Sequence, residues 1–319
     1  MRVLAFAAFA AGAGLLAALI WRAGLSPLAS ALSTLGVAGL GLICLAHLPV
    51  LGLLGAAWRA ISRVSLANAF IRFAWARAVR DAAAEALPLS QLGGYVLGAR
   101  ALALAGVDAA SAGVSTFYDL LFEFAAKVPY VLVGLALLEL ARGSEAAALT
   151  FGAAAIVSLA VFLAPRARWA SRKTVQALIA FARRIPRSRP AISSLIRGRI
   201  LRGGARSSIL IHLGCWILGA GETWLIFRLM NLSVRVTDAL VVDSLVGAIR
   251  AASFFVPAAI GVQEGGYVLI CGLFAISPAS ALAVSLARRA RDLVIAAPML
   301  VSWQWKEARG MSRRAAGAR

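Results

Sequence analysis

The heptapeptide QLGGYVL at residues 91–97 occurs again as QEGGYVL at residues 263–269, with six of the seven positions identical. A histidine, an arginine and a proline precede each copy, and an aspartate follows it. These flanking residues are His47, Arg80, Pro88 and Asp119 for the first copy and His212, Arg250, Pro257 and Asp292 for the second. Their common order predicts a duplication, with one unit at residues 45–141 and the other at residues 210–303.

Composition indicates a membrane protein. The 319 residues are 61% hydrophobic and the mean hydropathy is +0.86, whereas soluble domains are about 45–50% apolar. Residues 3–21 form an uninterrupted apolar run, close to the roughly 20 residues that a spanning helix needs. Further apolar runs occupy residues 32–57, 113–138, 146–165, 207–227 and 279–303. The sequence therefore predicts an all-α polytopic membrane protein, with residues 1–319 forming a single transmembrane domain.

The net charge of +20 is concentrated beside these apolar runs. Twelve of the 33 Lys and Arg residues lie in a loop at residues 166–206 that has no acidic residue, and residues 59–80 and the tail 304–319 hold five each. Basic residues next to spanning helices mark the cytoplasmic side, and they also attract anionic lipid headgroups. We therefore expect the loop and both termini in the cytoplasm, and membrane lipids rather than nucleic acid as partners.

The same charge rule orders the membrane crossings. Residues 82–106 and 244–276 are interrupted by Pro, Gly and charged residues, so neither is expected to form one straight span. If each forms a re-entrant helical hairpin, the two hairpins enter the membrane from opposite sides. The predicted architecture is an inverted repeat of six spanning helices and two re-entrant hairpins, eight hydrophobic elements in all. Inverted repeats with broken helices are typical of transporters.

Several hairpin residues suit a backbone that turns inside a bilayer. Proline removes an N–H donor and breaks a helix, glycine permits tight turns and close helix approach, and glutamine can bond freed backbone groups. The residues with these expected roles are Pro88, Gly93, Gly94, Pro257, Gly265 and Gly266, with Gln91 and Gln263 at the hairpin tips. The two glutamines are either scaffold or contacts for a bound lipid.

Charged residues at membrane depth are candidates for a substrate site, because an intramembrane charge usually marks a pathway or an ion pair. Arg80 and Arg250 match across the repeat, and a guanidinium fork suits phosphate or carboxylate. Asp119 and Glu123 lie one turn apart on one helix face, where they could pair with these arginines or with Lys127, or carry protons. We expect the four residues of the two pairs to contact a substrate. A structural ion-pair network is the alternative.

Two further groups complete the candidate site. Glu264, next to the second glutamine, is a candidate for substrate binding. His47, His212 and Asp292 could form a proton relay, although an intramembrane histidine can equally serve as a hydrogen-bonding residue between helices. The three cysteines lie in apolar runs and neither a CxxC nor an HExxH motif occurs, so we expect no metal site and no cofactor.

With these residues in place, two segments resemble a known family. They are AVRDAAAEALPLSQLGGYVLGARALALAG (78–106) and FFVPAAIGVQEGGYVLICGLFAIS (254–277). The chain is similar, over essentially its whole length, to the transmembrane flippase-like domain of lysylphosphatidylglycerol synthases, and most similar to the hopanoid biosynthesis-associated inner-membrane proteins of that superfamily. The resemblance implies a multi-pass protein of a bacterial inner membrane that handles lipid, with other hopanoid-synthesis proteins as partners.

In the synthases, a domain of this kind moves an aminoacylated lipid between leaflets and a separate soluble domain makes that lipid. Only 14 residues follow Trp305 here, so we expect no aminoacyl transfer. A membrane enzyme for polyprenyl or sterol-like lipids would need an Asp-rich metal motif or a nucleophile motif, and neither DDxxD nor GxSxG occurs. We therefore expect a lipid flippase or transporter and no enzyme. A membrane enzyme or scaffold in hopanoid or isoprenoid lipid synthesis is the alternative.

Overall fold

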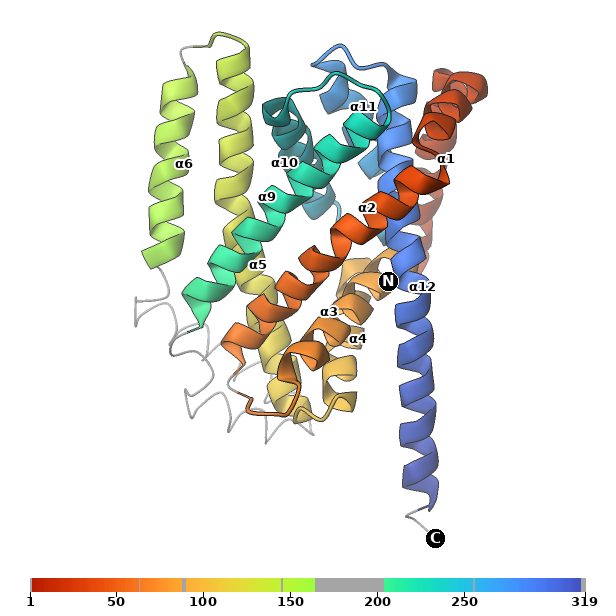
Figure 1. The fold of residues 1–319 in the computed structure, drawn as a ribbon, viewed down its shortest axis with the longest axis vertical. Helices are drawn as coiled ribbons and strands as arrows, with labels where there is room; N and C mark the ends of the chain where they lie inside the picture. The colour runs from red at the N-terminus through yellow and green to blue at the C-terminus, as the bar shows by residue number, and fades with distance from the viewer. Residues whose placement is uncertain are drawn as a thin grey trace.

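The structure, a computed structural model, describes residues 2–62, 64–87, 90–144, 146–163, 204–254 and 256–316, and these ranges contain helices but no strand. In chain order (Figure 1), the α-helices are α1 (Arg2–Ala23), α2 (Leu25–Ile61), α3 (Ala69–Ala86), α4 (Ser90–Leu104), α5 (Ala109–Ala141), α6 (Ala146–Leu163), α9 (Ala205–Leu229), α10 (Val236–Ala252), α11 (Val262–Gly272) and α12 (Pro278–Ala316), with a 3-10 turn, η2 (Pro257–Ala259), before α11. Most of the basic loop at residues 166–206 lies outside the described residues.

The described helices form two sets with the same order and the same packing partners. α3 packs on α2 and α4, and α4 packs on α5, just as α10 packs on α9 and α11, and α11 on α12. The sets also cross over, because α12 lies against α2 and α3 while α5 lies against α9 and α10. Figure 1 places α3 and α4 in the lower half of the molecule and α10 and α11 in the upper half. Two related units at residues 45–141 and 210–303 would pack in this way, although the units and their inversion stay predictions.

Four of the described helices are long and apolar enough to cross a membrane, which supports the prediction of a multi-pass membrane protein. Their apolar segments are Phe6–Ala23, Leu25–Ile61, Ala109–Ala141 and Ala205–Leu229. The apolar part of α6 is shorter, at Ala148–Ala160. α12 is long, but four charged residues, Arg288, Arg289, Arg291 and Asp292, lie within five consecutive positions of it. The total of six spans and eight hydrophobic elements therefore stays a prediction.

Each predicted hairpin is a broken pair of helices, but the bounds differ from 82–106 and 244–276. The first pair runs from Ala69 to Leu104, and Pro88 in its break lies outside the described residues. The second runs from Val236 to Gly272, and Pro257 opens the turn in its break. Residues 69–80 were expected in a cytoplasmic segment at 59–80. They lie in α3, the first helix of this pair, where Asp119 and Glu123 of α5 bind Arg77 and Arg80, and their side of the membrane stays a prediction.

The glycines of the repeated heptapeptide lie inside α4 and α11 rather than in turns, which corrects their expected turn role. The second turn instead uses Ala258 and Gly261, with φ of 50° and 76°. A Cβ atom on Gly94 would lie 2.7 Å from the carbonyl oxygen of Arg80, whereas one on Gly266 would meet nothing nearer than 3.4 Å. The expected close helix approach is thus found at Gly94, where α4 packs against α3.

The tight contact at Gly94 gives a first prediction. Gly94→Ala should lower the free energy of unfolding by about 1–3 kcal/mol, the usual cost of adding a methyl group to a filled interface, because the obstructing atom belongs to the backbone of α3. Gly214→Ala in α9 is the matched control, since a Cβ there meets nothing within 4 Å and alanine favours a helix by about 1 kcal/mol. Thermal unfolding in detergent measures both. Equal melting temperatures for the two variants would contradict the packing.

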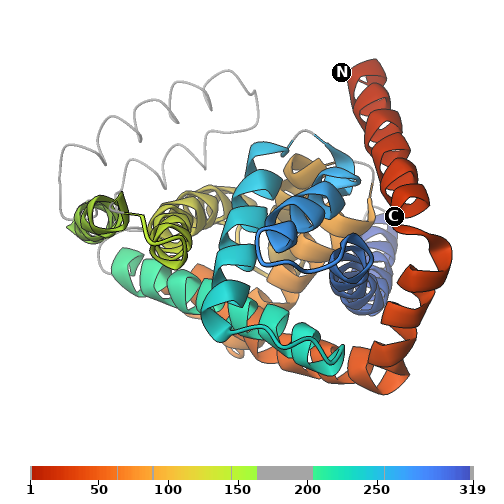
Figure 2. The ribbon, with the colours of Figure 1, turned by 90° about the horizontal axis from the view of Figure 1, so that it is seen from above.

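α1 lies at the edge of the bundle and packs on the turn of the second hairpin (Figure 2). Only 6% of its apolar segment is buried. Its closest approach is at Gly12, where a Cβ atom would lie 2.2 Å from the carbonyl oxygen of Ile260. α1 ends at Gly24 (φ 84°), and α2 is kinked at Gly36 (φ 61°). These glycines let the chain bend around the bundle and leave most of α1 free to contact lipid.

The apolar core has one part around each hairpin. In the first part, Phe73 of α3 and Leu102 of α4 pack with Trp58 of α2. In the second, Val242 of α10 and Tyr267 of α11 pack with neighbours from α9 and α12. All five side chains are buried. Apolar packing therefore holds each hairpin in place, so the charged residues on the same helices are available to line an internal cavity.

Candidate functional site

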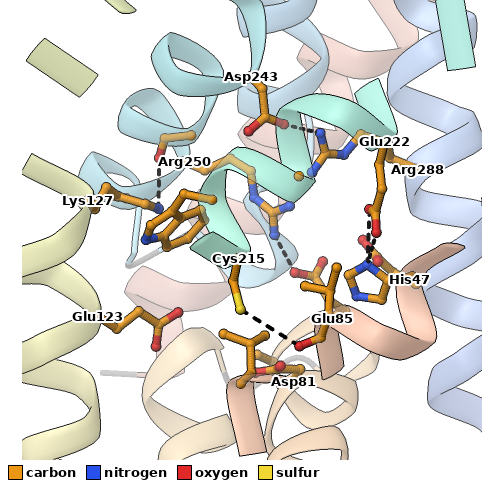
Figure 3. Close-up of a pocket in the computed structure, with 18 of the residues that line it drawn as sticks. His47, Asp81, Glu85, Glu123, Lys127, Cys215, Glu222, Asp243, Arg250 and Arg288 are labelled. Carbon is orange, nitrogen blue, oxygen red and sulfur yellow. Dashed lines mark hydrogen bonds and ion pairs between the residues drawn. The ribbon is translucent and has the colours of Figure 1, made fainter. Parts of the chain in front are cut away.

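Both hairpins and the helices α2, α5, α9 and α12 contribute to one cavity of about 220 Å³. Eight helices, α2 to α5 and α9 to α12, each supply at least one side chain to its wall. The basic side chains on the wall are Arg77, Arg80, Lys127, Arg250, Arg288 and Arg291, and the acidic ones are Asp81, Glu85, Glu123, Glu222, Asp243 and Asp292. In Figure 3, Lys127 and Glu123 lie on one side of the cavity and His47 and Glu222 on the other.

The first ion-pair cluster joins the first hairpin to α5. The guanidinium of Arg80 donates to Asp119 at 2.6 Å and also binds Glu123. Arg77, one turn earlier on α3, donates to Asp119 at 3.1 Å and to Glu123 at 3.0 Å. The Nε2 atom of His212 lies 3.1 Å from the other oxygen of Asp119. Asp119 is completely buried, so this carboxylate is held by three basic side chains from two helices.

The hairpin itself positions Arg80. The guanidinium carbon of Arg80 lies 4.3 Å from the centre of the Tyr95 ring, a cation–π distance. A Cβ atom on Gly98 would lie 2.7 Å from the Cβ of Arg80, so α4 presses directly on this residue. Tyr95 belongs to the repeated heptapeptide. Tyr95 of the first heptapeptide therefore helps to position Arg80, the arginine that matches Arg250 in the sequence.

A second cluster surrounds Asp243 of α10. Tyr130 of α5 and Thr223 of α9 each donate a hydroxyl hydrogen bond to its carboxylate, both at 2.8 Å. The guanidinium of Arg288 binds both Asp243 and Thr223. Asp243 and Arg288 both lie on the cavity wall. The second hairpin is thus tied to α5, α9 and α12 by one carboxylate.

A third cluster joins α2, α9 and α12. The Nδ1 atom of His47 lies 2.9 Å and 3.0 Å from the two oxygens of Glu222. Glu222 also binds Arg291, which donates to Asp292 at 2.6 Å. His47 and Asp292 are therefore connected through two intervening side chains, whereas His212 lies in the first cluster. The three residues of the expected proton relay do not form one continuous chain of hydrogen bonds among the described residues.

Arg250 forms a different kind of link, because its guanidinium binds Glu85. This pair joins α10 of the second hairpin to α3 of the first, and no other ion pair between described residues joins the two hairpins. Both side chains lie on the cavity wall and are about one-fifth exposed, at 20% and 17%. Both residues of the pair therefore reach the cavity, whereas Asp119 itself does not.

The glutamate and glutamine of the second heptapeptide have partners within their own unit. Gln263 lies on the cavity wall and donates to Ser285 at 3.0 Å. Glu264 is fully buried, accepts from Arg289 at 2.8 Å and accepts from the backbone N–H of Gly261 at 2.8 Å. Glu264 thus caps α11 and binds α12. The side chain of Gln91 lies outside the described residues, so the expected meeting of the two tips stays a prediction.

Of the predicted substrate contacts, Arg80, Glu123, Arg250 and Gln263 lie on the cavity wall, as do His47 and Asp292. Asp119, Glu264 and His212 do not, since each is completely buried and held by internal partners. The sequence interpretation left out Arg77, Glu222, Asp243 and Arg288 as members of the site. Glu222 is the one acidic residue of α9, and Asp243 lies in the largely apolar middle of α10, a signal that could have identified both. Among the described residues no group of three His, Cys, Asp or Glu could hold a metal ion.

Comparison with known proteins gives one match. The family model for the lysylphosphatidylglycerol synthase TM region matches residues 3–298, a range that includes both hairpins and every residue of the cavity wall. Comparisons with curated proteins and with solved structures found no match. The resemblance stated from the sequence is thus confirmed at the family level, whereas the hopanoid association stays a prediction. The chain belongs to the lysylphosphatidylglycerol synthase transmembrane-region family.

Proposed function

We propose that the protein moves a polar-headed lipid between the two leaflets of a membrane. The observation that carries this proposal is the charged cavity, to which both hairpins contribute. A cavity lined by charged side chains within apolar helices offers a polar headgroup an environment that lipid tails cannot provide. The tails need no such environment, because the outer faces of the helices are apolar and exposed.

The paired packing of the helices supports an alternating mechanism. Each set contains a broken hairpin, and the hairpins lie in opposite halves of the molecule (Figure 1). If the sets are inverted copies, exchanging their conformations opens the same cavity to the other side. The Arg250–Glu85 pair would break and re-form in that exchange because it spans the two hairpins. The ion pairs around Asp119 and Asp243 would stay intact during the exchange. Their charged groups would therefore not have to leave one partner and lose water again before binding another.

Leaflet exchange in reconstituted vesicles tests the proposal. Lipids with a fluorescent label are incorporated in both leaflets, and a membrane-impermeant quencher is then added outside. We expect the protein to make the inner-leaflet label accessible to the quencher, for a hopanoid, a phospholipid or both, without added nucleotide. Protein-free vesicles and vesicles with heat-denatured protein are the controls. Equal quenching in all three preparations would contradict transport.

The orientation of the protein is a second part of the proposal. We propose a bacterial inner-membrane location with both termini and the 166–206 loop in the cytoplasm, because of the acid-free run of basic residues in that loop. Ser144, between α5 and α6, and Ser233, between α9 and α10, then face outward.

Cysteine labelling in intact cells checks this orientation. In a background without Cys44, Cys215 and Cys271, we expect Ser144→Cys and Ser233→Cys to react with an impermeant maleimide added from outside, and Ser193→Cys in the loop to be protected. The opposite labelling pattern would invert the topology and contradict the charge rule.

A further inference from the structure

In the described part of the chain, one basic side chain of the cavity wall forms no ion pair with a carboxylate. Each of the five arginines on the wall binds at least one Asp or Glu within ion-pair distance. Lys127 of α5 has no such partner among the described residues. The carboxylate one turn before it, Glu123, is already bound by Arg77 and Arg80. Lys127 is thus the cation of the wall that remains available to a bound anion.

Two contacts hold the Lys127 ammonium in place without cancelling its charge. It donates to the backbone carbonyl of Gly247 at 3.3 Å, and its nitrogen lies 4.0 Å from the centre of the Trp216 ring. An ammonium group has three N–H donors, so at least one stays free after these contacts. Figure 3 shows the side chain reaching from α5 to α10 at the edge of the cavity. The position is therefore preorganised to donate into the cavity.

The neighbours of Lys127 indicate which kind of anion fits. Arg250 lies on the same wall, one helical turn beyond Gly247, so a second cation is close to the anchored ammonium. Phe124, one turn before Lys127, also lines the cavity and is 42% exposed. A volume of about 220 Å³ is below the roughly 300–1,000 Å³ of pockets that enclose a whole drug-sized ligand. A charged headgroup can enter this space while its tails continue outward past an apolar side chain.

We propose that Lys127 is the anion-binding residue of the cavity and that its ligand is the phosphodiester of a lipid headgroup. This inference rests on the proposed function and narrows it, because it favours a lipid with an anionic group over an uncharged hopanoid. Two oxygens of a phosphodiester can accept from the Lys127 ammonium and the Arg250 guanidinium at once, since both donors line one wall.

The effect of replacing Lys127 on the melting temperature distinguishes a binding role from a structural role. A charge buried at membrane depth without an anionic partner is costly, so Lys127→Gln should leave the melting temperature of the ligand-free protein unchanged or higher. If Lys127 stabilised the fold as Asp119 does, the same change would lower the melting temperature. The sign of this shift therefore separates a binding residue from a structural one, and a clear decrease would overturn the proposal.

Ligand binding in a non-ionic detergent tests the assignment directly. The probes are dihexanoyl phosphatidylglycerol, its uncharged counterpart dihexanoylglycerol, and glycerol 3-phosphate as a phosphate without tails. We expect the intact protein to bind the first probe at least about tenfold more tightly than the other two. Lys127→Gln should lose about tenfold or more of that affinity, because a charged hydrogen bond is removed. Lys127→Arg should retain most of it.

The matched control is Lys306→Gln. Lys306 also lies over a tryptophan ring, 3.8 Å from the centre of Trp75, but it is not on the cavity wall. We expect this change to leave phospholipid binding unaltered. Equal binding of the phospholipid by Lys127→Gln and the intact protein would overturn the proposal. If the intact protein bound dihexanoylglycerol as tightly as dihexanoyl phosphatidylglycerol, the ligand would not need a negative charge. If it bound glycerol 3-phosphate as tightly, the ligand would not need to be a lipid. Either result would overturn that part of the proposal.

The outcome can be separated from that of the proposed function. If vesicles show leaflet exchange but Lys127→Gln binds and moves the anionic lipid normally, transport stands and the Lys127 assignment fails. If binding depends on Lys127 but no exchange occurs, the assignment stands and transport fails.

Discussion

Asp119→Asn should lower the free energy of unfolding by about 3–5 kcal/mol, the usual loss when one partner of a buried ion pair is removed. Asp119 is completely buried and accepts from Arg77, Arg80 and His212. The amide has nearly the same shape but no charge, so the two guanidiniums would lose the negative charge that Asp119 supplies. Two arginines that are both only 3% exposed would keep Glu123 and Asp81 as their carboxylate partners but lose the fully buried one. Chemical unfolding in mixed micelles measures the change.

Arg235→Gln is the control for this prediction. Its ion pair with Asp238 has the same chemistry, but the arginine side chain is 71% exposed, and exposed pairs contribute little to stability. We expect its melting temperature to equal that of the unaltered protein. If Asp119→Asn were as stable as this control, the cluster around Asp119 would not hold the first hairpin against α5.

Glu85→Arg should reduce leaflet exchange by more than about tenfold, because it places a second guanidinium beside Arg250. Like charges brought together in this way cost several kcal/mol, and each 1.36 kcal/mol on a barrier is about tenfold in rate. The pair spans the two hairpins and lies open to the cavity. Repulsion should therefore hold the hairpins apart and prevent one state of the alternation.

The reversed pair, Glu85→Arg with Arg250→Glu, should recover part of the exchange because an ion pair can form again. Arg250→Lys keeps the charge but loses the two-pronged hydrogen-bonding geometry, so we expect reduced exchange with a normal melting temperature. Glu307→Arg is the matched control, since it disrupts the ion pair with Arg100 at a position away from the cavity. Normal exchange by a folded Glu85→Arg variant would show that the hairpin-to-hairpin pair does not take part in transport.

The residues of the cavity wall could be predicted only in part. Arg80 and Arg250 were recognised because they match across the repeated sequence, and both line the cavity. Their environments differ, however. Arg80 shares two carboxylates with Arg77 and is 3% exposed, whereas Arg250 has one described carboxylate partner and a side chain 20% exposed. Equal spacing in the sequence therefore did not indicate equal roles, since the second unit has no arginine one turn before Arg250.

Lys127 shows why partner choice is hard to predict from a sequence. Its spacing of four residues from Glu123 suggests an ion pair on one helix face. In the structure, arginines of α3 bind Glu123, and Lys127 turns instead to Gly247 and Trp216. The competing arginines lie more than 40 residues away in the chain. The sequence around Glu123 therefore does not show which of several cations forms an ion pair with it in the folded protein.

The sequence by itself determined the helical membrane class, the positions of the two hairpin breaks and the family. Each of these properties can be read from a short stretch of sequence: an apolar run, a proline or glycine, or the repeated heptapeptide. Only the tertiary structure decided that Arg80 lies in an ion-pair cluster, that Arg250 binds Glu85, and that Lys127 has no carboxylate partner among the described residues. Those outcomes depend on which helices pack together, because an ion pair forms between side chains that are close in space and can be far apart in the chain.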